Sequence, residues 1–484
     1  MRALSILGCG SGAGKSWLTT ALGAWLHGQA VQVAPFKAQN MSNNAWVTLD
    51  GGEIGRAQAI QAEACGLVPT VQMNPILLKP SGHSGSQLIV LGQSRGHCAA
   101  ADYYARFAEL WQTVAATLDG WKSRCDVLLL EGAGSPVELN LLHADLVNLR
   151  PCRYLDGRWI LVGDIDRGGI FAQLAGAWQL IEPADRARSL GAVVNRFRGD
   201  PALFEAPQRW LAPYAPGLAV LGTLPFRPEL QPEEEDGLRP EDQVRGCGEL
   251  LAWIRFPQVA NLTDCQPWWS DRGVQTRWVS TPRELEAARI IVLPGTKNTL
   301  ADLRWLRSTG LAEAIVAAAR RGVLVIGLCG GFQMLGERLI DPDGVAGDAG
   351  VASGLGLLPA ETRFAADKTL RQVTAICEHS QWQAYEIHMG DTLALSALQP
   401  LQLVRDLHGT RHEGMRRANV WGTYLHGWFE SPQLRAMVCR AAGVQGHQPH
   451  PLPWIEQRKR LYSAMAQHLA AHVNLEPVKR YLAL

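Results

Sequence analysis

The sequence predicts an α/β fold of two domains, each built on a largely parallel sheet. Short apolar runs bounded by Gly or Pro alternate with helix-like segments throughout, which is typical of a parallel sheet covered by helices on both faces. One glycine-rich loop follows the first apolar run, and another glycine-flanked turn follows a buried run in the C-terminal half. At 484 residues the chain is too long for one ordinary core, so two large domains fit best.

The apolar runs place the expected strands and leave a gap between two groups of them. In the first half the strands are expected at Ala3–Leu7, Val31–Ala34, Val127–Leu130, Ile160–Val162, Ala192–Val194 and Val220–Leu221. In the second half they are expected at Ile290–Leu293, Val323–Leu328 and Val420–Tyr424. Over Pro225–Gly248 the apolar periodicity stops, and the acidic run inside it is either a solvated linker or part of an active site. We therefore expect a domain over residues 1–230, a linker over 231–249 and a second domain over 250–484.

Composition narrows the class of protein. Charged residues make up 19% of the chain and the net charge is only +1, so no nucleic-acid partner is expected. The ten cysteines show no CxxC pair, which argues against a disulfide framework and a zinc site and favours a reducing cytosol. No signal-peptide pattern follows Met1, and no apolar run is long enough to span a membrane. We expect a cytoplasmic protein with no membrane partner.

The first glycine-rich loop, GCGSGAGKS from Gly8 to Ser16, predicts a nucleotide site. It follows a strand and opens a helix over Trp17–Leu26, the context that a phosphate-binding loop requires. Backbone N–H groups and the helix N-terminus would face the phosphates, Lys15 would neutralise their oxygens, and Ser16 would bind Mg²⁺. The spacing departs from the usual pattern, because the leading glycine stands six positions before Gly14 instead of five.

Acidic residues at the ends of two expected strands are candidate ligands for that Mg²⁺. Glu131 ends one strand and is followed by Gly-Ala-Gly, while Asp164 and Asp166 follow another. Mg²⁺ prefers a few oxygen ligands together with phosphate and water, so one or two carboxylates suffice. An acid in this position can equally be a helix cap. Glu131 is the strongest candidate.

The second turn predicts a nucleophilic cysteine. Cys329 lies between the buried run Val323–Leu328 and a helix-like segment, and glycines on both sides make a sharp strand-to-helix turn possible. The helix N-terminus would lower the pKa of the thiol. The Gly330 N–H could donate to an oxyanion, with a second donor from Gly295 in the loop after another strand. The alternative is a buried, inert cysteine.

A histidine is needed as the base for such a cysteine. His426 stands at the end of the run Val420–Tyr424 and is our first candidate. His388, in the segment Tyr385–Gly390, is a rival, although the polar and aromatic residues there could equally shape a substrate pocket.

Together these segments resemble one family nearly end to end, the cobyric acid synthases, which are glutamine-dependent amidotransferases of cobalamin biosynthesis. The resemblance rests on the loop, the cysteine turn and the segments Pro35–Met41, Asp50–Gln58, Met73–Pro80, Gly85–Gln87, Glu131–Pro136, Asp164–Gly169, Asn195–Asp200, Pro294–Thr299 and Tyr385–Gly390. It implies an N-terminal P-loop domain of dethiobiotin-synthetase type and a C-terminal triad-type (class I) glutamine amidotransferase domain.

The resemblance also implies the reaction and further site residues. The expected activity is ATP-dependent amidation of the b, d, e and g carboxylates of adenosylcobyrinic acid a,c-diamide, giving adenosylcobyric acid, with L-glutamine or ammonia as nitrogen source. Lys37 would join the loop in binding ATP, and Asn195 would read the adenine edge. Asp50 or Glu53 could complete the Mg²⁺ shell beside Ser16 and Glu131. Basic residues that could contact the polyanionic corrinoid are Arg56, Lys79 and Arg167.

Three departures from the family pattern limit this transfer. Gly12 stands where the loop usually has Asp, and Ala38 stands where a Pro is usual. Related amidotransferases carry a glutamate two positions after the catalytic histidine, in the motif His-x-Glu, but here Trp428 occupies the position of that glutamate. We therefore expect Cys329 and His426 to act as a dyad without a third member.

Three other readings stay open on the sequence. An a,c-diamide synthase shares both domain types but modifies other carboxylates. The segments over residues 35–58 favour the cobyric acid synthase family over this alternative. CTP synthase has a similar plan but normally keeps the His-x-Glu motif. A partitioning-type ATPase with a degenerate second domain would lack glutaminase activity.

Overall fold

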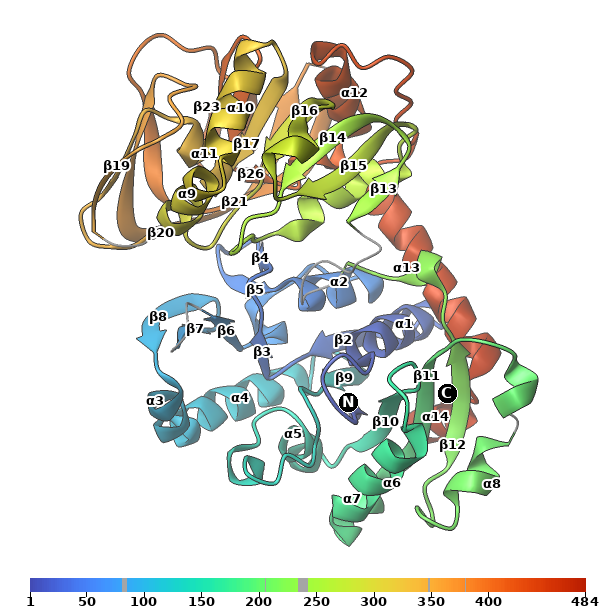
Figure 1. Cartoon of the computed structure of the whole chain (residues 1–484). Helices are drawn as coiled ribbons and strands as arrows, with labels where there is room; N and C mark the ends of the chain where they lie inside the picture. The colour runs from blue at the N-terminus through green and yellow to red at the C-terminus, as the bar shows by residue number, and fades with distance from the viewer. Residues whose placement is uncertain (81–84, 205, 234–242, 347–348, 379) are drawn as a thin grey trace. The chain divides into compact units, whose positions relative to one another are not determined.

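The computed structural model divides the chain into two compact units (Figure 1). It describes residues 1–484 except 81–84, 205, 234–242, 347–348 and 379, so the part of the expected linker over 234–242 lies outside the described residues. Unit 1 comprises Met1–Ser42, Gly52–Glu233 and Arg458–Leu484, and unit 2 comprises Asn43–Gly51 and Glu234–Gln457. The division differs from a single cut at two places, because residues 43–51 lie in unit 2 and residues 458–484 in unit 1.

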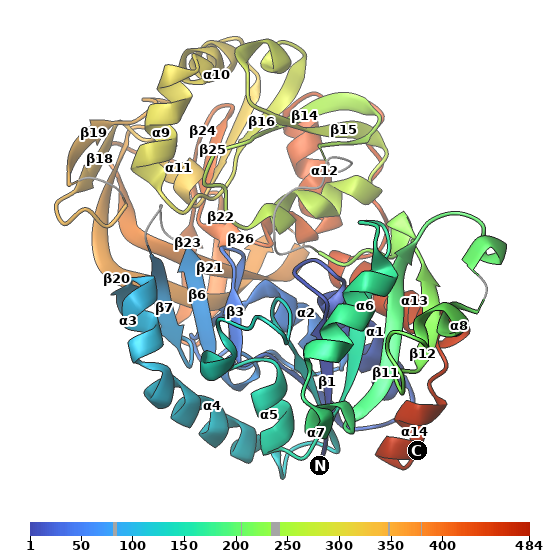
Figure 2. The same cartoon turned by 60° about the horizontal axis from the view of Figure 1, so that its bottom comes forward.

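Unit 1 is built on a six-stranded parallel sheet with the order β12-β11-β10-β1-β9-β2. Three of these strands, β1, β11 and β12, are labelled in Figure 2. Its strands are β1 (Arg2–Gly8), β2 (Val33–Phe36), β9 (Val127–Glu131), β10 (Arg158–Asp164), β11 (Ser189–Phe197) and β12 (Val220–Pro225). Each coincides with or overlaps an expected apolar run. The expected α/β class is confirmed, since helices cover both faces of this sheet.

The two faces of this sheet are covered by different sets of helices. One face packs against α1 (Lys15–Gly28), α2 (Arg56–Ala64), α13 (Trp454–His472) and α14 (Glu476–Leu482). The other packs against α4 (Phe107–Trp121), α5 (Leu149–Tyr154), α6 (Ile170–Leu180) and α8 (Pro207–Leu211). The short helices α3 (Ala100–Ala105) and α7 (Pro183–Arg186) complete the set. The C-terminal helices belong to unit 1 because their apolar side chains are buried in the same core as α1.

A smaller sheet in unit 1 has the order β3-β6-β7-β8. Its strands are β3 (Gln39–Met41), β6 (Ile76–Pro80), β7 (Ser86–Val90) and β8 (Gln93–Cys98). The short strands β4 (Ala45–Val47) and β5 (Glu53–Gly55) lie between β3 and α2 in the chain.

Unit 2 contains a seven-stranded sheet with the order β13-β15-β14-β16-β17-β25-β24, parallel at its centre. Its strands are β13 (Val244–Gly246), β14 (Gly248–Ile254), β15 (Gly273–Val279), β16 (Ala288–Leu293), β17 (Leu324–Leu328), β24 (Met415–Arg417) and β25 (Val420–Thr423). One face packs against α9 (Thr299–Ser308), α10 (Leu311–Arg320) and α11 (Gly330–Leu335). The other packs against the 3₁₀ helix η6 (Leu262–Ser270) and α12 (Pro432–Ala441).

A second large sheet in unit 2, which was not expected from the sequence, is built on a long antiparallel pair of strands. Its strands are β18 (Arg338–Asp341), β19 (Gly350–Ser353), β20 (Ala360–Cys377), β21 (Ser380–Ala394), β22 (Gln402–Asp406), β23 (Gly409–Glu413) and β26 (Leu425–His426). Polar and apolar residues are interspersed along β20 and β21, so these strands lack the continuous apolar runs by which buried strands are recognised.

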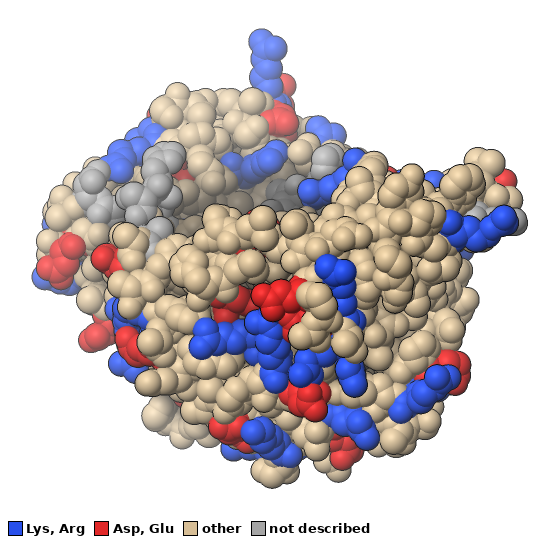
Figure 3. Space-filling model, turned by 90° about the horizontal axis from the view of Figure 1, so that it is seen from below, with Lys and Arg blue, Asp and Glu red and all other residues tan. Residues whose placement is uncertain are grey.

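Among the described residues, no helix is long and apolar enough to cross a membrane. On the face shown in Figure 3, acidic and basic side chains are intermingled, in keeping with the near-zero net charge of the chain.

Candidate functional site

The phosphate loop in unit 1 links the end of β1 to the start of α1. Gly14 adopts φ 102°, and a Cβ there would lie 1.9 Å from Asn195 Nδ2, so only glycine fits. The Lys15 side chain folds back over the loop, where Nζ donates to Gly10 O at 2.9 Å and to Gly134 O at 3.0 Å. The loop therefore has the strand, turn and helix order expected of a phosphate site.

Glu131 lies beside this loop, because β9 is the parallel neighbour of β1. Its Oε1 accepts from Ser16 Oγ at 2.8 Å and from Lys37 Nζ at 2.8 Å, and its Oε2 accepts from Gln61 Nε2. Burial opposes ionisation, but the Lys37 charge and the three donors hold the pKa of Glu131 below its ordinary value. Gln61, on α2, is a partner that the sequence analysis missed.

The candidate magnesium ligands fall into two groups. Ser16 and Glu131 lie together, and a hydroxyl beside a carboxylate suits Mg²⁺ when phosphate and water supply the other ligands. Glu53 instead pairs with the buried Lys79, and Asp50, in unit 2, accepts a hydrogen bond from Thr48. No cluster of three His, Cys, Asp or Glu side chains suited to a metal occurs among the described residues. A ligand role for Asp50 or Glu53 stays a prediction.

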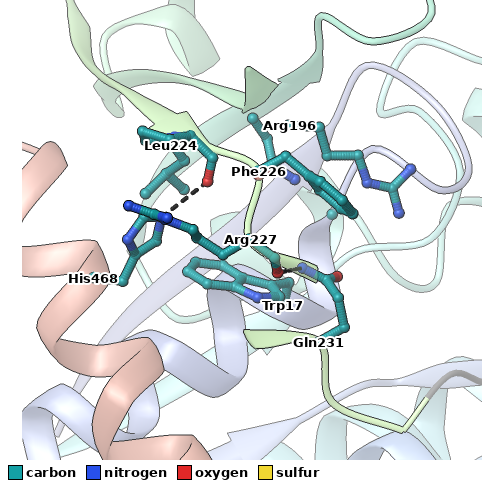
Figure 4. A pocket seen from close by; sticks show the side chains of 10 residues that line it. Trp17, Arg196, Leu224, Phe226, Arg227, Gln231 and His468 are labelled. Atoms are coloured by element: carbon teal, nitrogen blue, oxygen red, sulfur yellow. Dashed lines mark hydrogen bonds between the residues drawn. The ribbon is translucent and has the colours of Figure 1, made fainter. Parts of the chain in front are cut away.

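Asn195 is one of the residues that line a pocket next to the loop. Figure 4 shows this pocket from close by, with Trp17 and His468 among its labelled side chains. Asn195 Nδ2 donates to Ala13 O at 3.0 Å, which holds the amide against the loop. Trp17 of α1 and His468 of α13 also line the pocket, with their rings edge to face at 6.0 Å. His468 Nε2 contacts Pro225 O at 2.9 Å. The other lining residues are Gly14, Arg196, Leu224, Phe226, Arg227 and Gln231.

The basic residues suggested for corrinoid contact differ in exposure. Arg56 is buried and pairs with Glu233 at 2.6 Å, and Lys79 is buried beside Glu53. Arg167 is exposed and reaches the loop, where a Cβ on Gly12 would lie 2.8 Å from its Nη2. Of the three, Arg167 has the exposure that a ligand contact needs.

In unit 2, Cys329 stands between β17 and α11 with φ 49° and ψ −111°. Non-glycine residues rarely adopt a positive φ, so the turn is strained as expected. The Cys329 N–H donates to Thr423 O at 2.8 Å, which ties the turn to β25. A Cβ on Gly331 would lie 2.0 Å from Leu293 O, so the turn needs glycine after the cysteine.

His426 is fully buried and lies close enough to Cys329 to interact with its sulfur, which also contacts Ile387 O at 3.4 Å. Its Nδ1 lies 2.6 Å from Asp264 Oδ2, and the Gly427 N–H donates to Asp264 Oδ1 at 2.8 Å. Burial disfavours a charged imidazole, but Asp264 and Cys329 together raise the pKa of His426 to about 10. The expected dyad is wrong, because Asp264 stands as third member behind the histidine.

Asp264 could not be found by spacing, since it lies on η6 and is separated from His426 by most of unit 2. Trp428, at the place of the absent glutamate, donates its indole N–H to Gln402 Oε1. No motif in the segment Leu262–Trp268 marks this acid, which the structure shows to be buried.

The two candidate oxyanion donors lie on facing segments. A Cβ on Gly330 would lie 2.6 Å from Thr296 Cγ2, and a Cβ on Gly295 would lie 2.9 Å from His426 Cε1. The loop after β16 is therefore packed against both the cysteine turn and the histidine, while Gly331 N donates to Pro294 O at 3.1 Å.

His388, the rival base, has a different environment. Its ring stacks on Tyr424 with centroids 3.7 Å apart, and Nδ1 contacts Gly390 O at 2.9 Å. Burial is the main reason that the pKa of His388 falls to about 4. A neutral, stacked imidazole suits a wall of the site better than a base that must accept and release a proton near pH 7.

Two family models match successive parts of the chain. Residues 4–240 match the CobQ/CobB/MinD/ParA nucleotide binding domain, and residues 251–434 match the CobB/CobQ-like glutamine amidotransferase domain. A solved glutamine amidotransferase aligns over 40% of this chain and 100% of its own, with 15% identity and a TM-score of 0.31. MinD from Pyrococcus horikoshii, solved with Mg-ADP, aligns over 47% of this chain and 83% of its own, with 16% identity and a TM-score of 0.26.

Full-length relatives are much closer. Cobyric acid synthase from Roseiflexus castenholzii is 43% identical over 98% of both chains. The enzyme from Variovorax paradoxus is 46% identical over 91% of this chain and 94% of its own, and that from Nostoc punctiforme is 40% identical over 99% of both. The chain belongs to the cobyric acid synthase family.

Proposed function

We propose that this protein amidates the b, d, e and g carboxylates of adenosylcobyrinic acid a,c-diamide, using ATP and glutamine, to give adenosylcobyric acid. The observation that carries the proposal is the similarity to cobyric acid synthases along nearly the whole chain. The geometry supports it, because unit 1 holds a phosphate loop beside a paired acid and unit 2 holds a Cys-His-Asp constellation.

In unit 1, a corrinoid carboxylate would attack the γ-phosphorus of ATP, forming an acyl phosphate and releasing ADP. Activation is needed because hydroxide is too poor a leaving group for direct attack by ammonia on the acid. Lys15 and Lys37 would neutralise charge on the transferring group. Ser16 and Glu131 would hold magnesium, which supplies further positive charge to the phosphates.

In unit 2, the Cys329 thiolate would attack the carboxamide carbon of glutamine. With Nδ1 held by Asp264, Nε2 is the His426 nitrogen left to face the sulfur. The imidazolium would give its proton to the departing nitrogen, so that ammonia leaves and a glutamyl thioester remains. The Gly330 and Gly295 N–H groups would stabilise the oxyanion. Water would then release glutamate from the thioester.

The two half-reactions meet when ammonia attacks the acyl phosphate. The C–N bond forms, the C–O bond to phosphate breaks, and inorganic phosphate leaves with its electron pair. Each amide formed therefore consumes one ATP and one glutamine.

The proposal is tested by mass spectrometry of adenosylcobyrinic acid a,c-diamide after incubation with the protein, ATP, Mg²⁺ and amide-¹⁵N glutamine. We expect a product that carries label at the four carboxylates. A matched sample with Cys329→Ala should form the same product from ammonia but not from glutamine. The matched cysteine control is Cys247→Ala, which changes an exposed thiol.

Each result decides part of the proposal. An unchanged corrinoid with both nitrogen sources would refute the acceptor. Label at a remaining carboxylate other than b, d, e and g would refute the assigned positions of amidation. Normal use of glutamine by Cys329→Ala would refute the cysteine mechanism while leaving the acceptor in place.

A further inference from the structure

A short segment from the N-terminal half of the sequence is built into unit 2. Residues 43–51, which we name the inserted segment, belong to unit 2, whereas Ser42 and Gly52 on either side of them belong to unit 1. Strand β4 within it is buried, with Ala45, Trp46 and Val47 exposed by at most 8%. Nothing in the sequence pattern around it predicted this placement.

One set of contacts leads from this segment to the face of the catalytic imidazole. Tyr385 Oη donates to Ala45 O at 3.3 Å, and the Trp46 indole packs against the Tyr385 ring with centroids 4.7 Å apart. Tyr385 in turn stacks on the His426 ring, with centroids 5.4 Å apart and planes inclined by 29°. Tyr385 and His426 are also cross-strand partners between β21 and β26. Trp46 therefore supports one side of the ring that supports His426.

A second set of contacts leads to the other partner of His426. Asn44 Oδ1 accepts from Leu262 N at 3.4 Å, and Asn261 Oδ1 accepts from Ala45 N at 3.4 Å. Asn261 is the residue before η6, has φ 54°, and its carbonyl accepts from Asp264 N at 3.2 Å. The inserted segment thus borders the turn that aims the Asp264 carboxylate at His426 Nδ1.

From this geometry we propose that the inserted segment is a positioning element of the glutaminase centre, with Trp46 as its principal side chain. It touches neither glutamine nor the sulfur in this role. It holds Tyr385 and the start of η6, and these hold the ring and Nδ1 of His426. Small displacements matter because a catalytic group misplaced by about 1 Å can lose roughly a hundredfold in rate. The chemistry rests on the proposed glutaminase reaction, but the positioning role concerns residues that no motif of that reaction includes.

The test compares Trp46→Ala with Trp46→Phe and with Trp305→Ala in the full-length protein. Trp305 is a matched control, since it is a partly buried tryptophan of unit 2 that packs on Phe256. For Trp46→Ala we expect kcat of glutamine hydrolysis to fall roughly ten- to a hundredfold, with KM changed by less than about threefold. Trp46→Phe should recover most of kcat, and Trp305→Ala should keep it. Ammonia-dependent amidation should persist in all three.

A second readout reports the cysteine itself. Iodoacetamide alkylation of Cys329 should slow in Trp46→Ala, because the displaced His426 imidazole would no longer activate the sulfur. The positioning role would be overturned if Trp46→Ala kept the kcat of glutamine hydrolysis and the alkylation rate of the wild type. It would also be overturned if Trp305→Ala lost as much kcat as Trp46→Ala. If Trp46→Ala does not fold, Trp46→Leu decides, because it removes the indole ring that packs on Tyr385 but keeps an apolar side chain in the buried strand; an unchanged kcat in that variant overturns the role.

These measurements separate this inference from the proposed function. Glutamate release and alkylation need no corrinoid, so the positioning role can be upheld or overturned even if the acceptor assignment fails. If the wild-type protein releases no glutamate from glutamine, the glutaminase assignment is refuted, and the positioning role that rests on it is refuted with it.

Discussion

At the scale of single residues, the Asp264 carboxylate decides how His426 meets Cys329. One carboxylate oxygen of Asp264 faces His426 Nδ1, and the other accepts a hydrogen bond from the Gly427 N–H. These two contacts fix the position of the carboxylate and the orientation of the imidazole ring. In Cys-His-Asp sites the acid stabilises the correct tautomer and the imidazolium that forms during the reaction. The absence of a glutamate after His426 therefore removes one route to a triad but not the triad itself.

Replacing Asp264 should impair only the glutamine half of the reaction. We expect Asp264→Asn to lower glutamine hydrolysis by roughly 10²- to 10⁴-fold, because the amide can stabilise the wrong tautomer and carries no charge. Ammonia-dependent amidation should continue near the wild-type rate. Glutamate release and corrinoid mass measure the two halves, and Asp343→Asn, in an exposed turn, is the control. Near-normal glutamine hydrolysis in Asp264→Asn would contradict a functional triad.

The charge on His426 also predicts how stability changes with pH. Its pKa rises from 6.5 to about 10 in the folded protein: burial opposes the charge, but Asp264 and the Cys329 hydrogen bond outweigh it. A raised pKa means that the stabilising contribution is fully present below about pH 6.5 and is lost as pH rises through about 10. The gap in free energy of unfolding between wild type and His426→Gln should therefore narrow from about pH 6 to about pH 10. Urea unfolding across this range measures it, and a widening gap would show that the ring is neutral in the folded state.

At the scale of elements, the turn between β17 and α11 depends on backbone approach. The Gly331 Cα faces the Leu293 carbonyl of the neighbouring strand β16, which cannot rotate away as a side chain could. This close backbone contact holds the end of β17 against the end of β16, and it places the cysteine next to the loop that carries Gly295.

A methyl group at position 331 should disrupt this close backbone contact. We expect Gly331→Ala to reduce the free energy of unfolding by about 1–3 kcal/mol and to lower glutamine hydrolysis. As a contrast, Gly176→Ala on α6 places its methyl group in open space and should raise stability by about 0.5–1 kcal/mol. Urea unfolding and glutamate release measure both variants, and equal stability of the two would contradict the tight packing at Gly331.

At the scale of the whole molecule, the C-terminal helices are part of the nucleotide-binding unit. Tyr462, Met465, Leu469, Val478 and Leu482 are buried in the core that contains α1 and one face of the six-stranded sheet. Arg458 also pairs with Glu63 at 2.9 Å and 3.1 Å. Burying an apolar face of this size makes the segment structural, and His468 adds to the pocket beside the phosphate loop.

Removal of this C-terminal segment should therefore destabilise unit 1. We expect deletion of residues 458–484 to lower the denaturant midpoint of unit 1 and to weaken nucleotide binding, because an apolar face of the sheet would be left open to water. Deletion of residues 483–484 alone, of which Leu484 is exposed, should change neither property. Denaturant unfolding with and without ATP measures the effect. Unchanged nucleotide binding after the larger deletion would place the segment outside the functional part of unit 1.

The sequence by itself determined what depends on local order along the chain. The Gly8–Ser16 loop, the strands beside it and the Cys329 turn are each made by neighbouring residues, whose glycines and apolar runs set the backbone whatever the rest does. The same holds for Glu131, which a strand end must present at the carboxyl edge of a parallel sheet.

Only the tertiary structure decided which distant side chains meet. Asp264 reaches His426 through the packing of η6, Ala45 of the inserted segment meets Tyr385 340 positions further along the chain, and α13 returns to the core of the first sheet. Such contacts carry no local period or spacing, because burial rewards any apolar or paired polar surface that fits, regardless of its distance along the chain. That is why the chemistry of both centres was readable from motifs, whereas the third member of the triad and its supports were not.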